Sequence, residues 1–332
     1  MEPIHSLKIG DVQLDNNVIL APMAGVTDLP FRTLCARSGA GMTCTEMVSA
    51  KAIYYNNKKT YELLKLSEEE PIISVQLFGH EPELMADMAT RIEEEINYDI
   101  LDINMGCPVP KVVNNEEGSA LMKNPLLAGR IVEETVSKTN RPVTVKIRIG
   151  FDDEHINAVE MAHVLEESGA SAIAVHGRTR EQYYSGEANW DVIADVKAHT
   201  TIPIIGNGDL TCFSDICEMY NQTKVDGYMI GRAARGNPWI FEGVLREAEE
   251  VSDKSDMVTN GNDYKPTWSS IKEMILTHAK MLVDYKGEYI GIREMRKHTA
   301  WYTAGFPHSA TFRGKVNEVE SLEELAELLG SI

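Results

Sequence analysis

The architecture of the chain is set by one stretch, Leu101-Asp102-Ile103-Asn104-Met105-Gly106-Cys107-Pro108. An apolar run that begins at Ile100 predicts a buried strand, and Asn104 and Gly106 predict the end of that strand and the start of a loop. Cys107 lies just past the predicted strand end, where parallel α/β folds place their chemistry. Such a cysteine could be a nucleophile, a metal ligand, a proton donor or a small buried side chain.

Seven further apolar segments resemble this strand in length and spacing. The eight predicted strands are 18–21, 42–45, 72–77, 100–104, 143–148, 172–176, 202–207 and 226–231. A short hairpin is predicted over 7–17, and helical spacing of apolar residues appears between strands, for example over 82–96, 157–168 and 189–199. Eight strands alternating with helices over about 230 residues predict an α/β fold, a (β/α)8 TIM barrel. A doubly wound sheet is disfavoured because no GxGxxG follows the first strand.

The composition is that of a large globular protein. The 332 residues are 43% hydrophobic, which is ample for a barrel and a small appendage. No apolar run approaches the roughly 20 residues that cross a bilayer, and the N-terminus lacks a signal-peptide pattern. Five cysteines without a CxxC pair disfavour a disulfide framework and a structural zinc site. We therefore expect a soluble, cytoplasmic protein with reduced thiols, no metal site and no membrane association.

Charge is unevenly distributed along the chain. The net charge of −19 argues against indiscriminate binding of polyanions, and the acidic run 68–70 is expected to be a solvated loop. The window 272–315 differs, because it holds eight Lys and Arg against four Asp and Glu, a net charge of +4. Helical periodicity over 268–285, 291–303 and 322–329 predicts a small C-terminal all-α domain in the same region. The expected domains are a barrel over 1–248, a polar linker over 249–266 and a helical domain over 267–332.

Polar residues occupy the predicted carboxyl ends of five different strands. They are Gln76, Asn104, Lys146, His176 and Asn207. In a barrel these ends converge on one mouth. Lys146 lies between apolar neighbours, and a buried lysine is costly without an anion. It is either a cation aimed at an electron-rich ring or a phosphate, or a lysine that snorkels at the barrel end.

Glycine-rich loops follow the last two predicted strands. They are Gly206-Asn207-Gly208-Asp209 and Gly231-Arg232-Ala233-Ala234-Arg235-Gly236. Loops at this place, together with a helix N-terminus, often bind phosphate in barrels. Their free N–H groups and Arg232 would hold a phosphate monoester, and the alternative is a pair of ordinary glycine-rich turns.

Four motifs together resemble those of the bacterial-type tRNA-dihydrouridine synthases. They are Ala21-Pro22-Met23-Ala24-Gly25-Val26-Thr27-Asp28, Asp102-Ile103-Asn104-Met105-Gly106-Cys107-Pro108, His176-Gly177-Arg178-Thr179 and Gly231-Arg232-Ala233. The resemblance runs from about Ile4 into the C-terminal helices. It implies FMN as the bound cofactor, NADPH as its reductant and, as substrate, a tRNA uridine that is reduced at its 5,6 double bond.

The resemblance also assigns roles to residues. It implies FMN contacts from Pro22, Met23, Ala24, Gln76, Lys146, His176, Asn207, Gly208, Asp209, Gly231 and Arg232. It places the catalytic cysteine at Cys107, which would donate a proton to the base and must therefore be a thiol when the substrate arrives. Lys146 and His176 could stabilise negative charge on the flavin or the pyrimidine.

A uridine inside folded tRNA must be swung out to reach a barrel mouth. The basic helical domain would grip the phosphates, and no obligate protein partner is implied. The expected substrate contacts are Asn104, Arg178, Arg180, Arg293, Arg296 and Lys297. The last three lie close enough on one predicted helix to share a face, although a solvated helix surface is the alternative.

Two other functions remain open from the sequence. One is an FMN-dependent barrel oxidoreductase acting on a small pyrimidine-like substrate, in which the basic helices would have no purpose. The other is a tRNA-binding protein that keeps a flavin barrel as a scaffold. The intact set of Cys107, Lys146 and His176 argues against the second.

Overall fold

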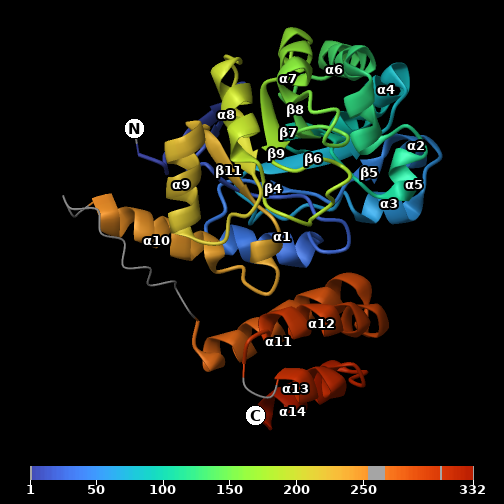
Figure 1. The fold of residues 1–332 in the computed structure, drawn as a ribbon. Coiled ribbons are helices and arrows are strands. Elements are labelled where there is room, and N and C mark those ends of the chain that lie inside the picture. The colour runs from blue at the N-terminus through green and yellow to red at the C-terminus, as the bar shows by residue number, and fades with distance from the viewer. Residues whose placement is uncertain (1, 253–265, 307–308, 332) are drawn as a thin grey trace.

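Eight parallel strands form a barrel in the computed structural model, which describes residues 2–252, 266–306 and 309–331 (Figure 1). In sheet order the strands are β3 (Val18–Leu20), β11 (Gly227–Ile230), β10 (Ile204–Asn207), β9 (Ala172–His176), β8 (Val143–Arg148), β7 (Ile100–Met105), β6 (Ile73–Phe78) and β4 (Thr43–Cys44). A parallel bridge between Ile19 and Met42 joins β3 to β4, and β5 (Val48–Ser49) adds to the edge of β6. The predicted (β/α)8 barrel and its eight strands are confirmed.

Helices cover the outside of the barrel (Figure 1). The longer ones are α1 (Leu29–Arg37), α4 (Pro82–Glu95), α6 (Pro125–Lys138), α7 (Ala158–Glu167), α8 (Trp190–Ala198), α9 (Phe213–Thr223) and α10 (Ile240–Ser252). Short ones are α2 (Ala50–Tyr54), α3 (Lys58–Glu62), α5 (Pro110–Val113) and the 3-10 turns η1 (Gly118–Lys123) and η2 (Arg232–Ala234). Asp28 starts α1, because its carboxylate accepts the N–H of Phe31 at 3.2 Å. No helix in the described ranges has the length and apolar character to cross a membrane.

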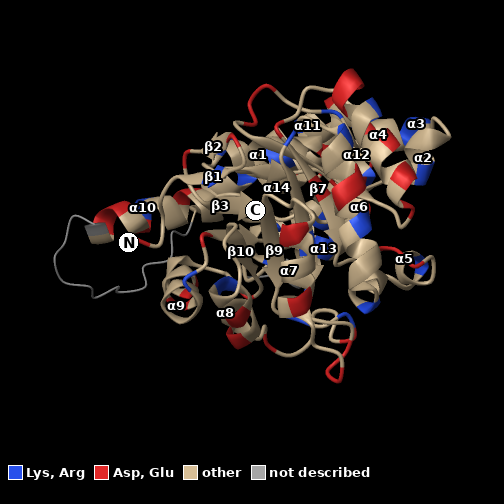
Figure 2. Ribbon diagram, turned by 90° about the horizontal axis from the view of Figure 1, so that it is seen from above, with Lys and Arg blue, Asp and Glu red and all other residues tan. Residues whose placement is uncertain are grey.

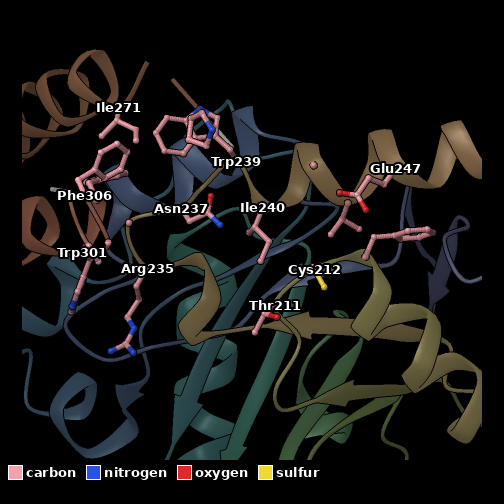
Figure 3. Close-up of a pocket in the computed structure, with 18 residues that line it drawn as sticks. Thr211, Cys212, Arg235, Asn237, Trp239, Ile240, Glu247, Ile271, Trp301 and Phe306 are labelled. Carbon is pink, nitrogen blue, oxygen red and sulfur yellow. The ribbon is translucent and has the colours of Figure 1, made fainter. Parts of the chain in front are cut away.

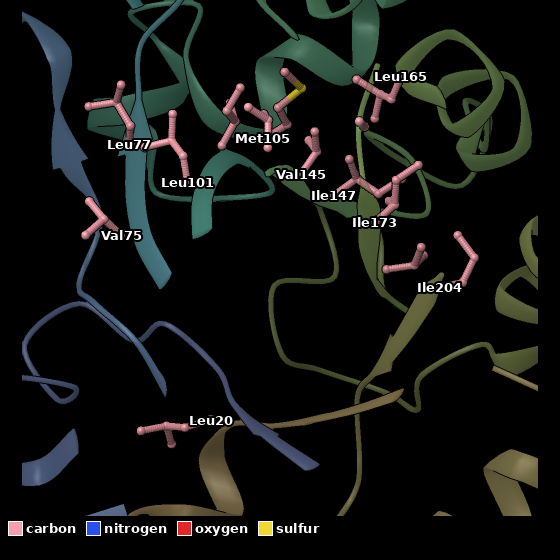
Figure 4. Packing of buried hydrophobic residues seen from close by; sticks show 14 of the residues in the cluster. Leu20, Val75, Leu77, Leu101, Met105, Val145, Ile147, Leu165, Ile173 and Ile204 are labelled. Carbon is pink, nitrogen blue, oxygen red and sulfur yellow. The ribbon is translucent and has the colours of Figure 1, made fainter. Parts of the chain in front are cut away.

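Successive side chains along each strand point alternately outward and inward, and the two sets belong to two separate hydrophobic clusters. Outward residues such as Leu101, Val145 and Ile173 pack beneath the helices (Figure 4). Inward residues such as Ile100 and Ala172 form a separate cluster with the hairpin of β1 (Leu7–Ile9) and β2 (Val12–Leu14). The predicted hairpin is thus confirmed, and it packs against the amino ends of the barrel strands.

The inward positions become more polar toward the carboxyl ends of the strands. On β7 the inward series is Ile100, Asp102 and Asn104, and on β9 it ends at His176. This gradient follows from the period of two along a strand. The apolar half of the barrel interior stabilises the fold, and the polar half is available for a site.

Four helices follow the barrel in the C-terminal part. They are α11 (Trp268–Lys286), α12 (Glu288–Tyr302), α13 (Ser309–Val316) and α14 (Leu322–Gly330), and they enclose their own hydrophobic cluster. The helix α11 lies against α1 of the barrel (Figure 1). The sequence missed α13, since Gly314 interrupts it and only Phe312 and Val316 mark its buried face. The predicted limits of the two domains stay predictions.

The helix α10 includes the first residues of the polar linker predicted over 249–266. The helix α10 continues to Ser252, because residues 246–251 are mostly good helix formers. Residues 253–265 of the predicted linker lie outside the described residues.

The acidic run 68–70 is only partly the solvated loop that was expected. Glu68 and Glu69 are exposed, but Glu70 is buried. Its carboxylate pairs with Arg32 at 2.7 Å and accepts a hydrogen bond from Thr43 at 2.6 Å. Glu70 therefore connects α1 to β4. Its ion pair and hydrogen bond compensate for burying its charge.

Candidate active site at the barrel mouth

A chain of side-chain hydrogen bonds links β6, β7 and β8 inside the barrel. Nε2 of Gln76 donates to Asp102 at 2.6 Å, and Nδ2 of Asn104 donates to Oε1 of Gln76 at 2.8 Å. The hydroxyl of Thr144 donates to the other oxygen of Asp102, also at 2.6 Å. Burial raises the pKa of Asp102, while these two hydrogen bonds to its carboxylate oppose the rise. The side-chain orientations of Gln76 and Asn104 are thereby fixed.

The loop that carries Cys107 is held on both sides. Oδ1 of Asn104 accepts the N–H groups of Gly106 at 3.2 Å and Cys107 at 2.9 Å. The carbonyl of Cys107 accepts the N–H of Ser119 at 3.1 Å and its hydroxyl at 2.8 Å. The thiol is half-buried. Burial raises its pKa, against smaller opposing effects of the Val109 backbone and the Arg148 charge, so the group is a thiol at neutral pH.

This protonation state narrows the four roles that the sequence left open for Cys107. A protonated thiol suits a proton donor better than a nucleophile. Among the described residues, no group of three or more His, Cys, Asp or Glu is placed to hold a metal ion.

Lys146 reaches across the barrel mouth from β8 to β10. Its Nζ donates to Oδ1 of Asn207 at 2.9 Å, and Nδ2 of Asn207 donates to the carbonyl of Met229 at 2.7 Å. The intervening strand β9 has Ala174 beside Lys146, and this small side chain leaves room for the crossing. Burial lowers the pKa of Lys146 to about 8, and the charge of Arg148 adds to the effect.

His176, at the end of β9, is surrounded by cations. Its pKa lies well below the ordinary value, first because of burial and then because of the charges of Lys146, Arg148, Arg178 and Arg232. The ring is therefore neutral at pH 7. Acidic residues, in contrast, are spread over outer elements such as α8 and α10 (Figure 2). The mouth thus gathers positive charge in a strongly acidic chain.

Asp209 organises two of these cations. Its carboxylate accepts from Arg178 at 2.7 Å, from Arg232 at 3.1 Å and from the N–H of Ala188 at 2.8 Å. Its backbone has a φ of 58°, in the left-handed region. Asp209 therefore holds Arg178 and Arg232 in place.

Arg178, which the sequence predicts as a phosphate or base contact, lies inside the protein. It is 2% exposed, and its nitrogens donate to the carbonyls of Ser185 and Gly186 as well as to Asp209. The loop after β9 folds back over the guanidinium, and these hydrogen bonds hold it in place. One nitrogen, Nη1, is buried without a hydrogen-bond partner among the described residues, and an anionic group could satisfy it.

The backbone between β10 and α9 approaches the site at a glycine. Gly208 has a φ of +126°, and a Cβ there would lie 2.7 Å from the Cβ of Ala188 and 3.2 Å from Cδ2 of His176. A side chain is therefore excluded on both conformational and steric grounds. Gly231, after β11, has Met23 from the β3 loop as a neighbour, 3.9 Å from the position of a Cβ. The two predicted glycine loops thus lie beside the cations of the mouth.

The remaining predicted substrate contacts are dispersed. Arg180 is half-buried, with its guanidinium 5.1 Å from the ring centre of Phe151. On α12, Arg293 lies 3.6 Å over the ring of Tyr289, and two nitrogens of Arg296 donate to the carbonyl of Val319. Nζ of Lys297 donates to the carbonyl of Gly25, in the loop after β3. Arg293 also pairs with Glu320 at 3.5 Å, so Arg293 and Arg296 both contact residues 319–320, whereas Lys297 contacts the barrel. The three basic residues of α12 therefore do not form one free face.

Sequence reasoning missed three residues of the mouth. Asp102 orders Gln76, and Arg148 donates to the carbonyl of Gly106 at 2.8 Å. The half-exposed ring of Tyr184 lies 5.0 Å from the guanidinium of Arg232. Asp102 and Arg148 were detectable, because each lies two positions from a predicted site residue on the same strand and so shares its face.

A separate cavity of about 800 Å³ lies between the barrel and the C-terminal helices (Figure 3). Arg235, Trp239 and Trp301 are among its lining residues. Arg235 and Gly236, at the end of the second predicted glycine loop, line it, but the predicted cofactor and catalytic residues of the barrel mouth do not.

The fold is shared with known redox enzymes. One is a 6-hydroxypseudooxynicotine amine oxidase from Pseudomonas geniculata, with a TM-score of 0.59 and 14% identity over 74% of this chain and 49% of that one. Another is a histamine dehydrogenase from a Rhizobium species, with a TM-score of 0.55 and 13% identity over 89% of this chain and 50% of that one. At such low identity these likenesses show the fold alone, which is a TIM barrel.

Sequence relatives identify the family. A family model described as "Dihydrouridine synthase (Dus)" matches residues 19–331. A probable tRNA-dihydrouridine synthase of Rickettsia bellii is 41% identical over 94% of this chain and 93% of its own length. A tRNA-dihydrouridine synthase B of Pseudomonas putida is 41% identical over 96% and 92%. The chain therefore belongs to the dihydrouridine synthase family, whose members are flavin-dependent oxidoreductases.

Proposed function

We propose that this protein reduces the 5,6 double bond of specific uridines in tRNA to dihydrouridine, with FMN as its bound cofactor and NADPH as the reductant. The observation that carries the proposal is the half-buried thiol of Cys107, which burial keeps protonated at the end of β7. Within a family of this activity, such a thiol fits a proton donor to the base.

The barrel mouth suits a flavin that carries a phosphate. Gly208 brings buried backbone close to His176, and Gly231 presents a half-buried backbone without a side chain. The exposed guanidinium of Arg232 follows Gly231 and would bind a phosphate there. The unpaired Nη1 of Arg178 is a buried donor that such an anion would satisfy. Pro22, Met23, Ala24, Gln76, Lys146, His176 and Asn207 would complete the cofactor site, and the Asp209 carboxylate would act through its two arginines.

The residues of the chain have distinct tasks in this reaction. When bound, the reduced flavin supplies the hydride that is added to C6 of the uracil. The thiol of Cys107 donates the proton to C5, which leaves a thiolate that solvent reprotonates. Asn104 holds the loop that presents the thiol. Lys146 offers a positive charge to the electron-rich rings, whereas neutral His176 offers a hydrogen bond.

The tRNA would be held by basic groups around the mouth and on the C-terminal helices. Arg180 and Arg293 keep half-exposed side chains, whereas Arg296 and Lys297 are engaged by carbonyl groups of the protein. The base would be swung out of the tRNA, and the affinity should fall as salt rises. A cytoplasmic location, where tRNA is modified, is part of the same proposal.

The test uses purified protein and tRNA that lacks dihydrouridine. With NADPH, we expect a flavin-coloured protein to form dihydrouridine in tRNA, seen as a mass increase of the nucleoside, and to leave free uridine unchanged. Reduction of free uridine at a comparable rate would favour the small-pyrimidine alternative. A colourless protein that cannot be reconstituted with FMN would refute the proposal.

A further inference from the structure

The loop that follows β3 is held by two residues from outside it. The N–H of Gly25 donates to the carboxylate of Glu46, which lies just after β4. The carbonyl of the same glycine accepts from Nζ of Lys297, on α12. Both peptide groups that flank Gly25 are thus fixed, one by the barrel and one by the C-terminal helices. Its φ of +71° is one that glycine adopts without strain.

The rest of this loop is fixed internally. The N–H of Met23 donates to the hydroxyl of Thr27 at 2.9 Å, and the N–H of Thr27 returns to the carbonyl of Met23 at 3.0 Å. At the end of the loop, Asp28 pairs with Lys286 of α11 at 2.9 Å. A turn also closes the tip, because the N–H of Val26 donates to the carbonyl of Met23 at 2.9 Å. The exposed peptide groups of Gly25 itself are held from outside the loop, by Glu46 and Lys297.

Charge explains why these two residues occur together. Glu46 is 8% exposed, and burial raises the pKa of its carboxyl, whereas the charges of Lys286 and Lys297 oppose that rise. A buried carboxylate needs a compensating cation and hydrogen-bond donors. Lys286 and Lys297 supply the positive charge, and the hydrogen bond of Lys297 goes to the next peptide group along the loop.

We propose that Glu46 and Lys297 are positioning residues that hold the tip of the Pro22–Gly25 loop against the flavin, so that docking of α12 on the barrel sets the affinity for the cofactor. This inference rests on the proposed function, because that function places Pro22, Met23 and Ala24 against the flavin. Lys297 then serves the cofactor site from a helix that the sequence assigned to RNA binding.

The experiment measures FMN binding by the full-length apoprotein through quenching of flavin fluorescence, with no tRNA present. Lys297→Met keeps the apolar stem and removes the donor, and we expect a dissociation constant about five- to tenfold higher, as for the loss of one charged hydrogen bond. Lys297→Arg keeps a donor and should restore most of the affinity. Lys280→Met, at an exposed lysine of α11, is the matched control and should leave the constant unchanged.

A second measurement does not depend on flavin. Hydrogen exchange of the peptide that spans residues 22–28 should be faster in Lys297→Met and in Glu46→Ala than in the unaltered protein. Wild-type flavin affinity and unchanged exchange in Lys297→Met would overturn the inference, and a loss of tRNA affinity alone would show that Lys297 binds RNA. If the unaltered protein bound no FMN, the proposed function would fail instead. The exchange result would still decide whether Glu46 and Lys297 hold the loop.

Discussion

Oδ1 of Asn104 lies 2.9 Å from the backbone nitrogen of Cys107, so the last inward side chain of β7 also caps the loop that carries the thiol. The same oxygen accepts the N–H of Gly106, and the amide nitrogen of Asn104 is fixed by Gln76. A single side chain thus links the barrel strands to the loop that carries Cys107. This arrangement gives Asn104 a positioning role that can be separated from contact with the substrate.

Replacing Asn104 by alanine should misplace Cys107 without unfolding the barrel. Two backbone N–H groups lose their acceptor, which costs about 1–3 kcal/mol when such groups are buried. We expect turnover of tRNA to fall at least tenfold while FMN still binds, as seen by absorbance and by dihydrouridine content. Asn124→Ala is the matched control, because Asn124 caps α6 in the same way but belongs to another part of the fold. Equal losses in both variants would count against the positioning role.

Removing the thiol should separate cofactor binding from turnover. In Cys107→Ala we expect FMN to remain bound and dihydrouridine formation to fall by about 10²- to 10⁴-fold, the usual contribution of a general acid. Reduction of the flavin by NADPH should be unaffected, which single-turnover absorbance can show. Cys212→Ala, at a half-buried thiol that precedes α9, is the control. Unchanged dihydrouridine formation by Cys107→Ala would remove the assignment of the proton donor.

The affinity for FMN should depend on pH through Lys146. Its pKa of about 8 means that the free protein loses this positive charge as pH rises past 8. An anionic cofactor then binds more weakly, by up to about tenfold for each further pH unit, which is the limit for one proton. Lys146→Arg should abolish the decline, and Lys146→Met should bind weakly across the range. A pH-independent affinity in the unaltered protein would contradict this role.

Acid should loosen the contact between the C-terminal helices and the barrel. The rings of His278 and His298 lie 4.5 Å apart, buried against Phe31 of α1, with Lys286 and Lys297 as nearby cations. Burial lowers the pKa of His278 to about 4, and that of His298 also lies well below its usual value. The unfolded chain therefore binds more protons than the native chain between pH 6.5 and 4, so stability falls as pH falls through this window.

For His278 alone the loss of folding free energy should reach about 3 kcal/mol by pH 4, because each tenfold difference in proton affinity between the folded and unfolded chain corresponds to about 1.4 kcal/mol. Urea unfolding at several pH values measures it. His298→Phe should reduce the loss of folding free energy between pH 6.5 and 4, the acid limb of the stability curve, because it removes one of the two titrating rings. The substitution breaks no hydrogen bond, since neither ring nitrogen of His298 has a partner among the described residues. His199→Phe, at an exposed ring, should leave the limb unchanged. An acid limb that His298→Phe does not alter would contradict this explanation.

The strands and the main polar residues of the site were predictable because they follow local rules. Eight apolar runs with polar carboxyl ends predict a barrel and one mouth, and Gln76, Asn104, Lys146, His176 and Asn207 do meet there. The sequence did not show which group each charged side chain pairs with in the folded protein. A buried Arg178 and a half-exposed Arg180 look alike as residues two positions apart.

The same limit applies to the C-terminal helices. Periodicity predicted α11, α12 and α14. It did not show that Arg296 donates to the carbonyl of Val319, within the C-terminal part, or that Lys297 reaches Gly25 of the barrel. These partners are set by tertiary contacts between segments about 20 to 270 residues apart in the chain, as the two hydrogen bonds themselves show. Glu46 was overlooked for the same reason, since its acceptor role depends on a loop that precedes it by 21 positions.

The hairpin of β1 and β2 has a kinetic consequence. Its side chains pack into the amino end of the barrel interior. Any molecule that reaches the carboxyl ends of the strands must therefore enter through the opposite opening. On the proposed function, the nicotinamide and the swung-out base would compete for the same space above one ring system. The two reactants would therefore take turns, and double-reciprocal plots at several fixed reductant concentrations should give parallel lines.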